Sequence, residues 1–182
     1  MDIKKQYIEL NQAIIKNDVQ KVKDLIKSGI CIETVDINSN TPLDLAIECD
    51  KLEIFELLLN AGAIIRIPTI VNITDFSGNF CMEMLALIIE NGIDVNITLE
   101  DKETLLMYAA EKGNLEVVKR LVDLGADINS ISRQADFALL NAGCQGHQEI
   151  FDYLAPKTSL QLRELATERL PSRFVKRLKN LC

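Results

Sequence analysis

The sequence predicts an all-α protein in which short antiparallel helix pairs stack into a solenoid. One observation is the stretch 104–129, where apolar residues recur at helical spacing in two short blocks separated by Gly113 and Asn114. A second is a glycine that closes four similar segments, 33, 30 and 33 residues apart, at Gly29, Gly62, Gly92 and Gly125. Each helix pair is too short to bury its own apolar face, so it needs neighbouring copies.

Two motifs recur in register with this period. Residues 41–46 read Thr-Pro-Leu-Asp-Leu-Ala, and residues 104–109 repeat that pattern in a weaker form. Residues 125–129 read Gly-Ala-Asp-Ile-Asn, and residues 62–63 begin in the same way. These segments resemble the Thr-Pro-Leu-His-x-Ala and Gly-Ala-Asp-Val-Asn motifs of the ankyrin repeat family, with Asp44 in the place of the histidine. The resemblance covers roughly residues 7–155.

The resemblance implies an ankyrin-repeat solenoid of about five helix-turn-helix repeats within residues 1–155. The expected repeats are at about 7–35, 36–66, 67–97, 98–131 and 132–155. Residues 156–182 lie outside the pattern, and we expect a basic helical C-terminal cap or tail there.

Composition excludes several classes of protein. No apolar run approaches the ~18 residues that a membrane helix needs, and the charged N-terminus has no signal-peptide core. The five cysteines are an odd number without CxxC spacing, which favours a reducing compartment. We therefore expect a cytoplasmic protein with no membrane contact.

The charge is unevenly distributed. From Pro156 onward there are seven Lys/Arg and two Asp/Glu, which is a net charge of +5. The first 155 residues have a net charge of −12, and the two parts together give the overall −7. An acidic body argues against nucleic acid, because phosphate contacts need a basic surface. It favours a protein partner with a basic or mixed-charge surface.

The first two repeats are regular. Residues 7–29 are expected to form a capping repeat whose outer face is solvated by Lys16, Lys21, Lys23 and Lys27. In the second repeat, Thr41 is predicted to lie near the helix N-cap, and Pro42 suits the first helical position. Its second helix is predicted over residues 52–60.

The third repeat departs from the period. Only six positions separate Gly62 from Pro68, so the hairpin finger before the first helix is shortened by about seven residues if Pro68 corresponds to Pro42. Residues 74–79 lengthen the turn before a second helix over 82–91. Two interpretations stay open: drift within one repeat, or a gap or protrusion that shapes a partner site.

The tail predicts two more amphipathic helices. Residues 158–170 place Leu162, Leu165, Ala166 and Leu170 on one face, with Thr158 or Ser159 as a cap, and residues 172–181 place Phe174, Val175, Leu178 and Leu181 inward. One interpretation is a cap on the fifth repeat. A second is a basic face that binds a partner. A third is a short resemblance of residues 159–166 to SOCS-box tails, which recruit ubiquitin ligases, although that family expects cysteine where Ala166 stands.

Catalytic motifs are sparse. His147 is the single histidine, so two-histidine zinc sites are excluded, and no phosphate-binding glycine loop is present. Cys144 lies three residues before it, which allows a thiolate–imidazole pair. However, Gly146-His147 matches a Gly-His that ankyrin repeats carry between helices, so the resemblance implies a structural role. We predict neither an enzyme nor a cofactor.

The resemblance implies that a partner docks on the fingers and the exposed side of the first helices. The candidate contacts are Asn38, Asn40 and Glu48 in the second repeat; Glu100, Asp101, Glu103, Glu111 and Lys112 in the fourth; and Arg133, Gln134 and Gln145 in the fifth, where Asp136 and Cys144 lie on the same surface. We expect a monomeric, non-enzymatic module that binds, and can regulate or inhibit, a protein partner. The alternatives are an adaptor whose tail recruits a second protein, and a Cys-His enzyme.

Overall fold

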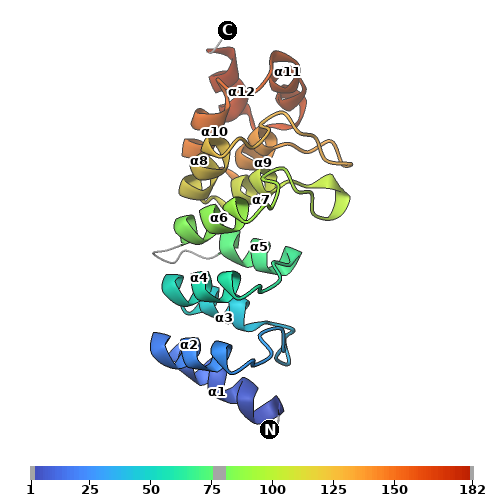
Figure 1. Cartoon of the computed structure of the whole chain (residues 1–182). Helices are drawn as coiled ribbons and strands as arrows, with labels where there is room; N and C mark the ends of the chain where they lie inside the picture. The colour runs from blue at the N-terminus through green and yellow to red at the C-terminus, as the bar shows by residue number, and fades with distance from the viewer. Residues whose placement is uncertain (1–2, 76–80, 181–182) are drawn as a thin grey trace. The chain divides into compact units, whose positions relative to one another are not determined.

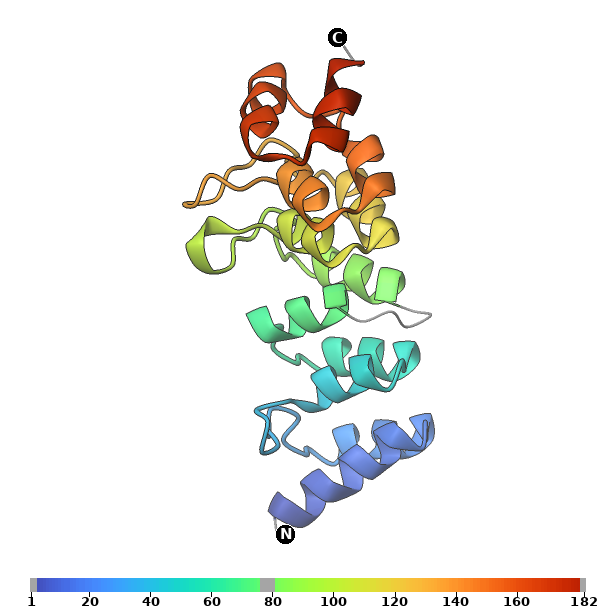
Figure 2. The same cartoon turned by 180° about the vertical axis from the view of Figure 1, so that it is seen from behind.

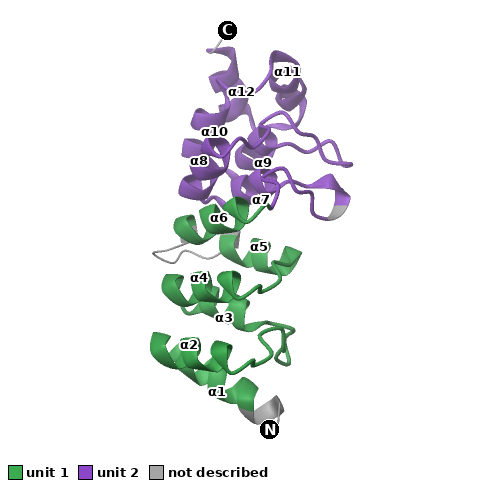
Figure 3. Cartoon of the chain, viewed as in Figure 1, with its two compact units in different colours: residues 1–92 green, residues 93–182 purple. Residues whose placement is uncertain are grey.

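The computed structural model describes residues 3–75 and 81–180 and divides into two compact units, residues 1–92 and 93–182 (Figure 3). In the described residues the regular structure consists of twelve α-helices and one 3-10 turn. The only extended pairing among them is an isolated bridge between Thr98 and Thr104. The prediction of an all-α fold of paired helices is therefore confirmed.

Unit 1 contains three helix pairs: α1 (Ile3–Ile15) with α2 (Val19–Lys27), α3 (Pro42–Glu48) with α4 (Leu52–Asn60), and α5 (Ile67–Asp75) with α6 (Cys81–Glu90). The first helices pack in the order α1, α3, α5, and the second helices in the order α2, α4, α6 (Figure 1). Two layers of helices therefore enclose one core. Its buried side chains include Leu10, Ile14, Val22, Ile47, Ile54, Phe55, Leu58, Ile70, Ile73, Leu85 and Ile88.

Unit 2 repeats this plan with α7 (Leu105–Lys112) and α8 (Leu115–Asp123), α9 (Ala138–Gln145) and α10 (Gln148–Leu154), and α11 (Leu160–Arg169) and α12 (Ser172–Lys179). Helices α7, α9 and α11 pack in one row, and α8 packs on α10 in the other. The segments before α7 and α9 extend beyond the helices (Figure 2). We call residues 97–104 the fourth finger and residues 130–137 the fifth finger.

Local chemistry explains where these helices start. Thr41 Oγ1 accepts a hydrogen bond from Asp44 N at 3.3 Å, while the Asp44 carboxylate accepts one from Thr41 N at 2.8 Å, which is a capping box. Pro42 follows as the first residue of α3. Both predictions for this turn are confirmed, and Thr104 caps α7 through Met107 N in the same way.

The third repeat has the short connection that the sequence predicts. Only six residues join Asn60 to Ile67, and Pro68 is the second residue of α5 rather than the first. Arg66 is the last residue of this short connection. Its guanidinium binds the buried Asp44 carboxylate at 2.5 Å and donates to Ser39 O at 3.0 Å. Most of the turn predicted over residues 74–79 lies outside the described residues.

The two tail helices pack on the fifth repeat. The Phe174 ring lies 4.6 Å from the Phe151 ring between centroids, and Arg177 Nη1 donates to both carboxylate oxygens of Asp152 at 2.7 Å. Leu162, Ala166, Leu170, Phe174 and Leu178 are buried, as the helical pattern predicts, and Val175 is half-buried. The predicted inward position of Leu165 is wrong, because its side chain is 38% exposed. Leu181 lies outside the described residues.

The capping prediction for the tail is confirmed in position, because Ser159 is the N-cap residue of α11. Ser159 precedes α11 but makes no side-chain capping bond. The Thr158 hydroxyl instead donates to Leu154 O at 3.0 Å, the last turn of α10. The backbone N–H of Ser159 donates to Asn129 Oδ1 at 2.8 Å. The connection between α10 and α11 is therefore bonded to the residue that precedes the fifth finger.

Candidate protein-binding groove

The candidate residues of unit 1 form a small hydrogen-bonded group on the finger before α3. Asp36 Oδ1 accepts hydrogen bonds from the backbone N–H groups of Asn38 and Asn40, each at 2.8 Å. The Asn40 side-chain amide donates to Glu48 Oε1 at 2.9 Å. The structure thus brings Asn38, Asn40 and Glu48 together.

In unit 2 the fourth finger is a narrow loop closed by Leu99 N donating to Glu103 O at 2.7 Å. Its tip is the 3-10 turn η1 (Glu100–Lys102), where Asp101 and Lys102 have φ values of 55° and 60°. These left-handed conformations turn the chain back toward α7. The Glu100 side chain lies outside the described part of the chain.

The fourth and fifth fingers are joined through Asp101. Its carboxylate accepts a hydrogen bond from Gln134 Nε2 at 2.9 Å and lies 3.8 Å from Arg133 Nη1. Its backbone carbonyl accepts a hydrogen bond from Arg133 N at 2.8 Å. Asp101, Arg133 and Gln134 therefore hold the two fingers together, a connection that the sequence analysis did not foresee.

A groove of about 410 Å³ lies beside these fingers. We call it the acidic groove. Its lining residues are Glu103, Glu111, Gln134, Asp136, Leu140, Asn141, Cys144, Gln145 and Arg169. Lys112 lies on the same helix as Glu111 but outside this lining, with its ammonium 5.0 Å from the centre of the Tyr108 ring. Four of the predicted contact residues, Glu103, Glu111, Gln134 and Gln145, thus line one concavity.

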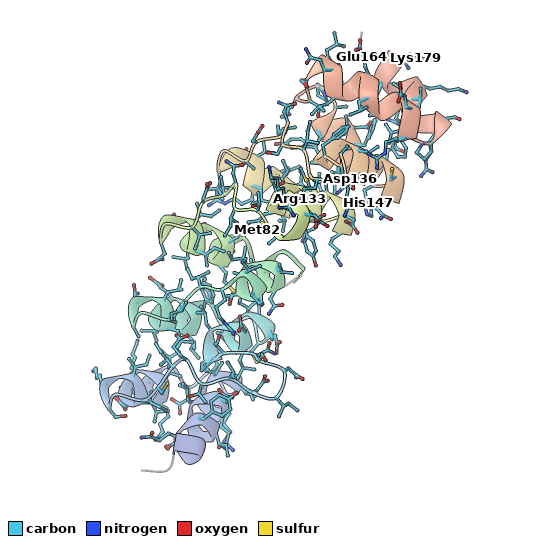
Figure 4. All side chains as sticks on the ribbon, turned by 90° about the vertical axis from the view of Figure 1, so that its right-hand side faces the viewer. Met82, Arg133, Asp136, His147, Glu164 and Lys179 are labelled. Atoms are coloured by element: carbon cyan, nitrogen blue, oxygen red, sulfur yellow. The ribbon has the colours of Figure 1, made fainter. Side chains whose placement is uncertain are left out.

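Leu140, Asn141 and Arg169 are lining residues that the sequence did not predict, and Arg169 is the one that comes from the tail. It is the last residue of α11, and its guanidinium binds Asp136 Oδ1 at 2.5 Å and Ala135 O at 2.8 Å. Figure 4 labels Asp136 and Arg133 on the fifth finger. Ala135 has a φ of 59°, so the arginine binds the tightest part of that turn. The tail therefore contributes one wall of the groove.

The electrostatics of the groove are dominated by carboxylates. Partial burial raises the pKa of Glu103 above its ordinary value, and the negative charges of Glu111, Asp136 and Asp101 raise it further, against a weaker opposing effect of Lys112. Within the described residues, neither the Glu103 nor the Glu111 carboxylate has a hydrogen-bonding or ion-pair partner. The groove can therefore accept a cation.

His147 has a structural place between α9 and α10. Its Nε2 lies 2.8 Å from Glu111 O, and its ring packs over Gly113, where an added Cβ would come within 2.5 Å of the imidazole. The contact joins the turns of two successive repeats. Cys144 is exposed in the groove lining. Nothing among the described residues forms a group of three or more His, Cys, Asp and Glu side chains suited to a metal ion.

Comparison with known families agrees with this architecture. A family model described as Ankyrin repeats (3 copies) matches residues 76–163, and one described as Ankyrin repeat matches residues 38–70. Together these segments span more than half of the chain. The chain belongs to the ankyrin repeat family. Ankyrin repeats are protein–protein interaction modules, and the family is generally non-catalytic.

Several relatives share this sequence pattern. The chain is 28% identical over 176 residues to the ankyrin repeat protein nuc-2 of Neurospora crassa. The aligned segment covers 91% of this chain and 16% of the relative. It is 25% identical over 143 residues to an ankyrin repeat protein of fowlpox virus, covering 79% and 34% respectively. A Notch-regulated ankyrin repeat-containing protein A of Danio rerio is 42% identical over 64 residues, or 35% of this chain and 57% of the relative. The chain spans only a minor part of the first two relatives.

In the described part of the chain, every helix is too short or too polar to cross a bilayer.

Proposed function

We propose that this chain is a non-enzymatic module that binds a basic or mixed-charge segment of a partner protein in the acidic groove. The observation that supports this most directly is the pair of unpartnered carboxylates, Glu103 and Glu111, in a concavity between finger and first helices. Burial is the main cause of the raised Glu103 pKa, and a partner lysine or arginine would offset the repulsion from neighbouring carboxylates that raises it further. Binding would then be favoured by compensation of a charge cluster that the fold leaves uncompensated.

The groove also presents groups that suit a mixed-charge partner. Gln134, Asn141 and Gln145 supply amides that can donate to or accept from a peptide backbone. Arg133, on the outer side of the fifth finger, is 68% exposed and able to meet a carboxylate of the partner. Exposed rim charges contribute only about 0.2–1 kcal/mol each, so the half-buried Glu103 is the more important contact in this proposal.

The finger of unit 1 is proposed as an additional contact surface. Asn38, Asn40 and Glu48 are ordered by the Asp36 turn, and the neighbouring Ile37 side chain is 99% exposed at its tip. An isolated aliphatic side chain on an ordered turn suits an apolar contact with a protein.

We further propose that the chain works as a monomer in the cytoplasm. Cys31, Cys49 and Cys144 are all free thiols, which suits a reducing compartment. Burial of the Cys49 side chain raises its thiol pKa, so this cysteine stays a weakly reactive thiol. The Cys-His enzyme is disfavoured because the His147 ring is engaged with Glu111 O and Gly113.

The test is capture of a binding partner with charge-reversed chains. We expect Glu103→Lys combined with Glu111→Lys to lower affinity and association rate at low salt, because both steering and contact charges are reversed. Asp123→Lys with Glu149→Lys is the matched control, since both acids are exposed on second helices away from the groove. A partner that binds both double variants equally well would contradict the proposed site.

A further inference from the structure

The last helix pair carries a second concave surface, separate from the acidic groove. It lies between α11 and α12, has a volume of about 160 Å³, and is lined by Leu160, Arg163, Glu164, Thr167, Leu178 and Lys179. We call it the end groove; Figure 4 labels Glu164 and Lys179 there. Its lining is almost entirely apolar, which the stems of the arginine and lysine side chains help to provide.

An apolar surface here is unexpected for the end of a helix stack. Terminal repeats usually turn a polar face outward, because no neighbour covers it. In α11, Leu162 and Ala166 are buried in the fold, whereas Leu160 is 51% exposed and Leu165 is 38% exposed. The helix therefore has apolar residues on its inner side and on its outer side, and the core explains only the inner ones.

The charges around the end groove are positive on balance. Arg169 and Arg177 of the same helix pair are neutralised within the fold by Asp136 and Asp152. Within the described residues, Arg163 and Lys179 have no ion-pair partner, and Arg163 Nε is a buried donor without an acceptor. Glu164 is the one acidic side chain in the lining.

We propose that the end groove receives one large aliphatic or aromatic side chain from a partner protein whose neighbouring residues are Asp or Glu. A volume of about 160 Å³ is below the usual range of small-molecule pockets, roughly 300–1,000 Å³, and suits a single side chain. Carboxylates beside that side chain would meet the Lys179 ammonium and the Arg163 guanidinium, two cations of the lining that the fold leaves without an ion-pair partner among the described residues. The partner class is thus opposite in charge to the one proposed for the acidic groove.

Charge and packing argue against two other occupants. A second copy of the chain, related by a two-fold axis, would bring the cations of one end groove against those of the other. A lipid surface would need the apolar face of α12, but Phe174 and Leu178 are 1% and 3% exposed because that face packs into the fold. A concave site also fits a protruding side chain better than a membrane plane.

The experiment is selection of phage-displayed random peptides on the full chain, followed by affinity measurements on variants. Thr167→Trp fills the groove, and Lys179→Glu reverses a lining charge. Lys176→Glu is the matched control, because Lys176 is exposed on the same helix and does not line the groove. Far-UV circular dichroism establishes that each variant is folded.

We expect selected peptides with a large apolar residue flanked by Asp or Glu, distinct from any basic peptides that bind the acidic groove. Thr167→Trp and Lys179→Glu should each weaken their binding about tenfold or more, and Lys176→Glu less than about twofold. The inference is overturned by the absence of acidic-apolar peptides, or by equal effects of Lys176→Glu and Lys179→Glu. It is also overturned if Lys179→Glu abolishes self-association in sedimentation equilibrium, or binding to phosphatidylserine-containing phosphatidylcholine vesicles.

Discussion

Replacing Phe174 by alanine tests whether the tail is an integral part of unit 2. The ring is 1% exposed and lies 4.6 Å from the Phe151 ring at an interplanar angle of 51°. Loss of a buried phenylalanine costs about 3–5 kcal/mol, of which the aromatic pair accounts for about 0.5–1.5 kcal/mol. Domains of this kind are stable by only about 5–15 kcal/mol, so Phe174→Ala should bring unit 2 close to unfolding.

The assay is urea denaturation followed by far-UV circular dichroism, because the chain contains no tryptophan. Phe174→Leu should cost less than the alanine variant, because it leaves a smaller cavity. Lys176→Ala, two residues further along α12 and exposed, should change stability by less than about 0.5 kcal/mol. If Phe174→Ala lost less than about 1 kcal/mol, the tail would not be packed on α10 as described.

Three further outcomes follow from the described contacts. The pKa of Glu103 is raised in the folded state, so its protonated form stabilises the fold below the unfolded pKa near 4.5, and this stabilisation is lost as pH rises through the folded pKa. Glutamine does not titrate. The free energy of unfolding of Glu103→Gln, measured by urea denaturation, should therefore increase relative to that of the wild type over this pH range. Arg66→Ala leaves the buried Asp44 carboxylate without its cation and should cost about 3–5 kcal/mol, measured the same way; a loss within about 0.5 kcal/mol would show that the pair is not buried. Gly113→Ala and Gly125→Ala both place alanine at positive φ, at a cost of about 1–2 kcal/mol, but only the first meets an imidazole, so thermal melts should show Gly113→Ala as the less stable.

The fold could be predicted from the sequence because its evidence is local and repeated. Thr41 and Pro42 start a helix by capping and by fixed φ, and the closing glycines mark helix ends at a steady spacing. These signals act within a few residues, so no knowledge of distant contacts is needed. The shortened finger before Pro68 was visible for the same reason.

The rest depended on contacts between residues 22 to 33 positions apart. Asp101 was predicted as a free partner contact, but it holds the fifth finger through Gln134. Arg169 lines the acidic groove although it belongs to the tail, and Arg66 reaches back to Asp44. No periodic pattern reports which arginine meets which carboxylate. Leu165 was misassigned because a helix with apolar residues on two sides has no single inward face.

The central claim is that the carboxylates of the acidic groove bind a cationic side chain of a partner protein. The most direct measurement is carboxyl-carbon NMR titration of Glu103, first in the free chain and then in the chain saturated with a captured partner. The account predicts a pKa above the ordinary glutamate value in the free chain and a clear fall on binding. An unchanged Glu103 pKa in the saturated complex would contradict it.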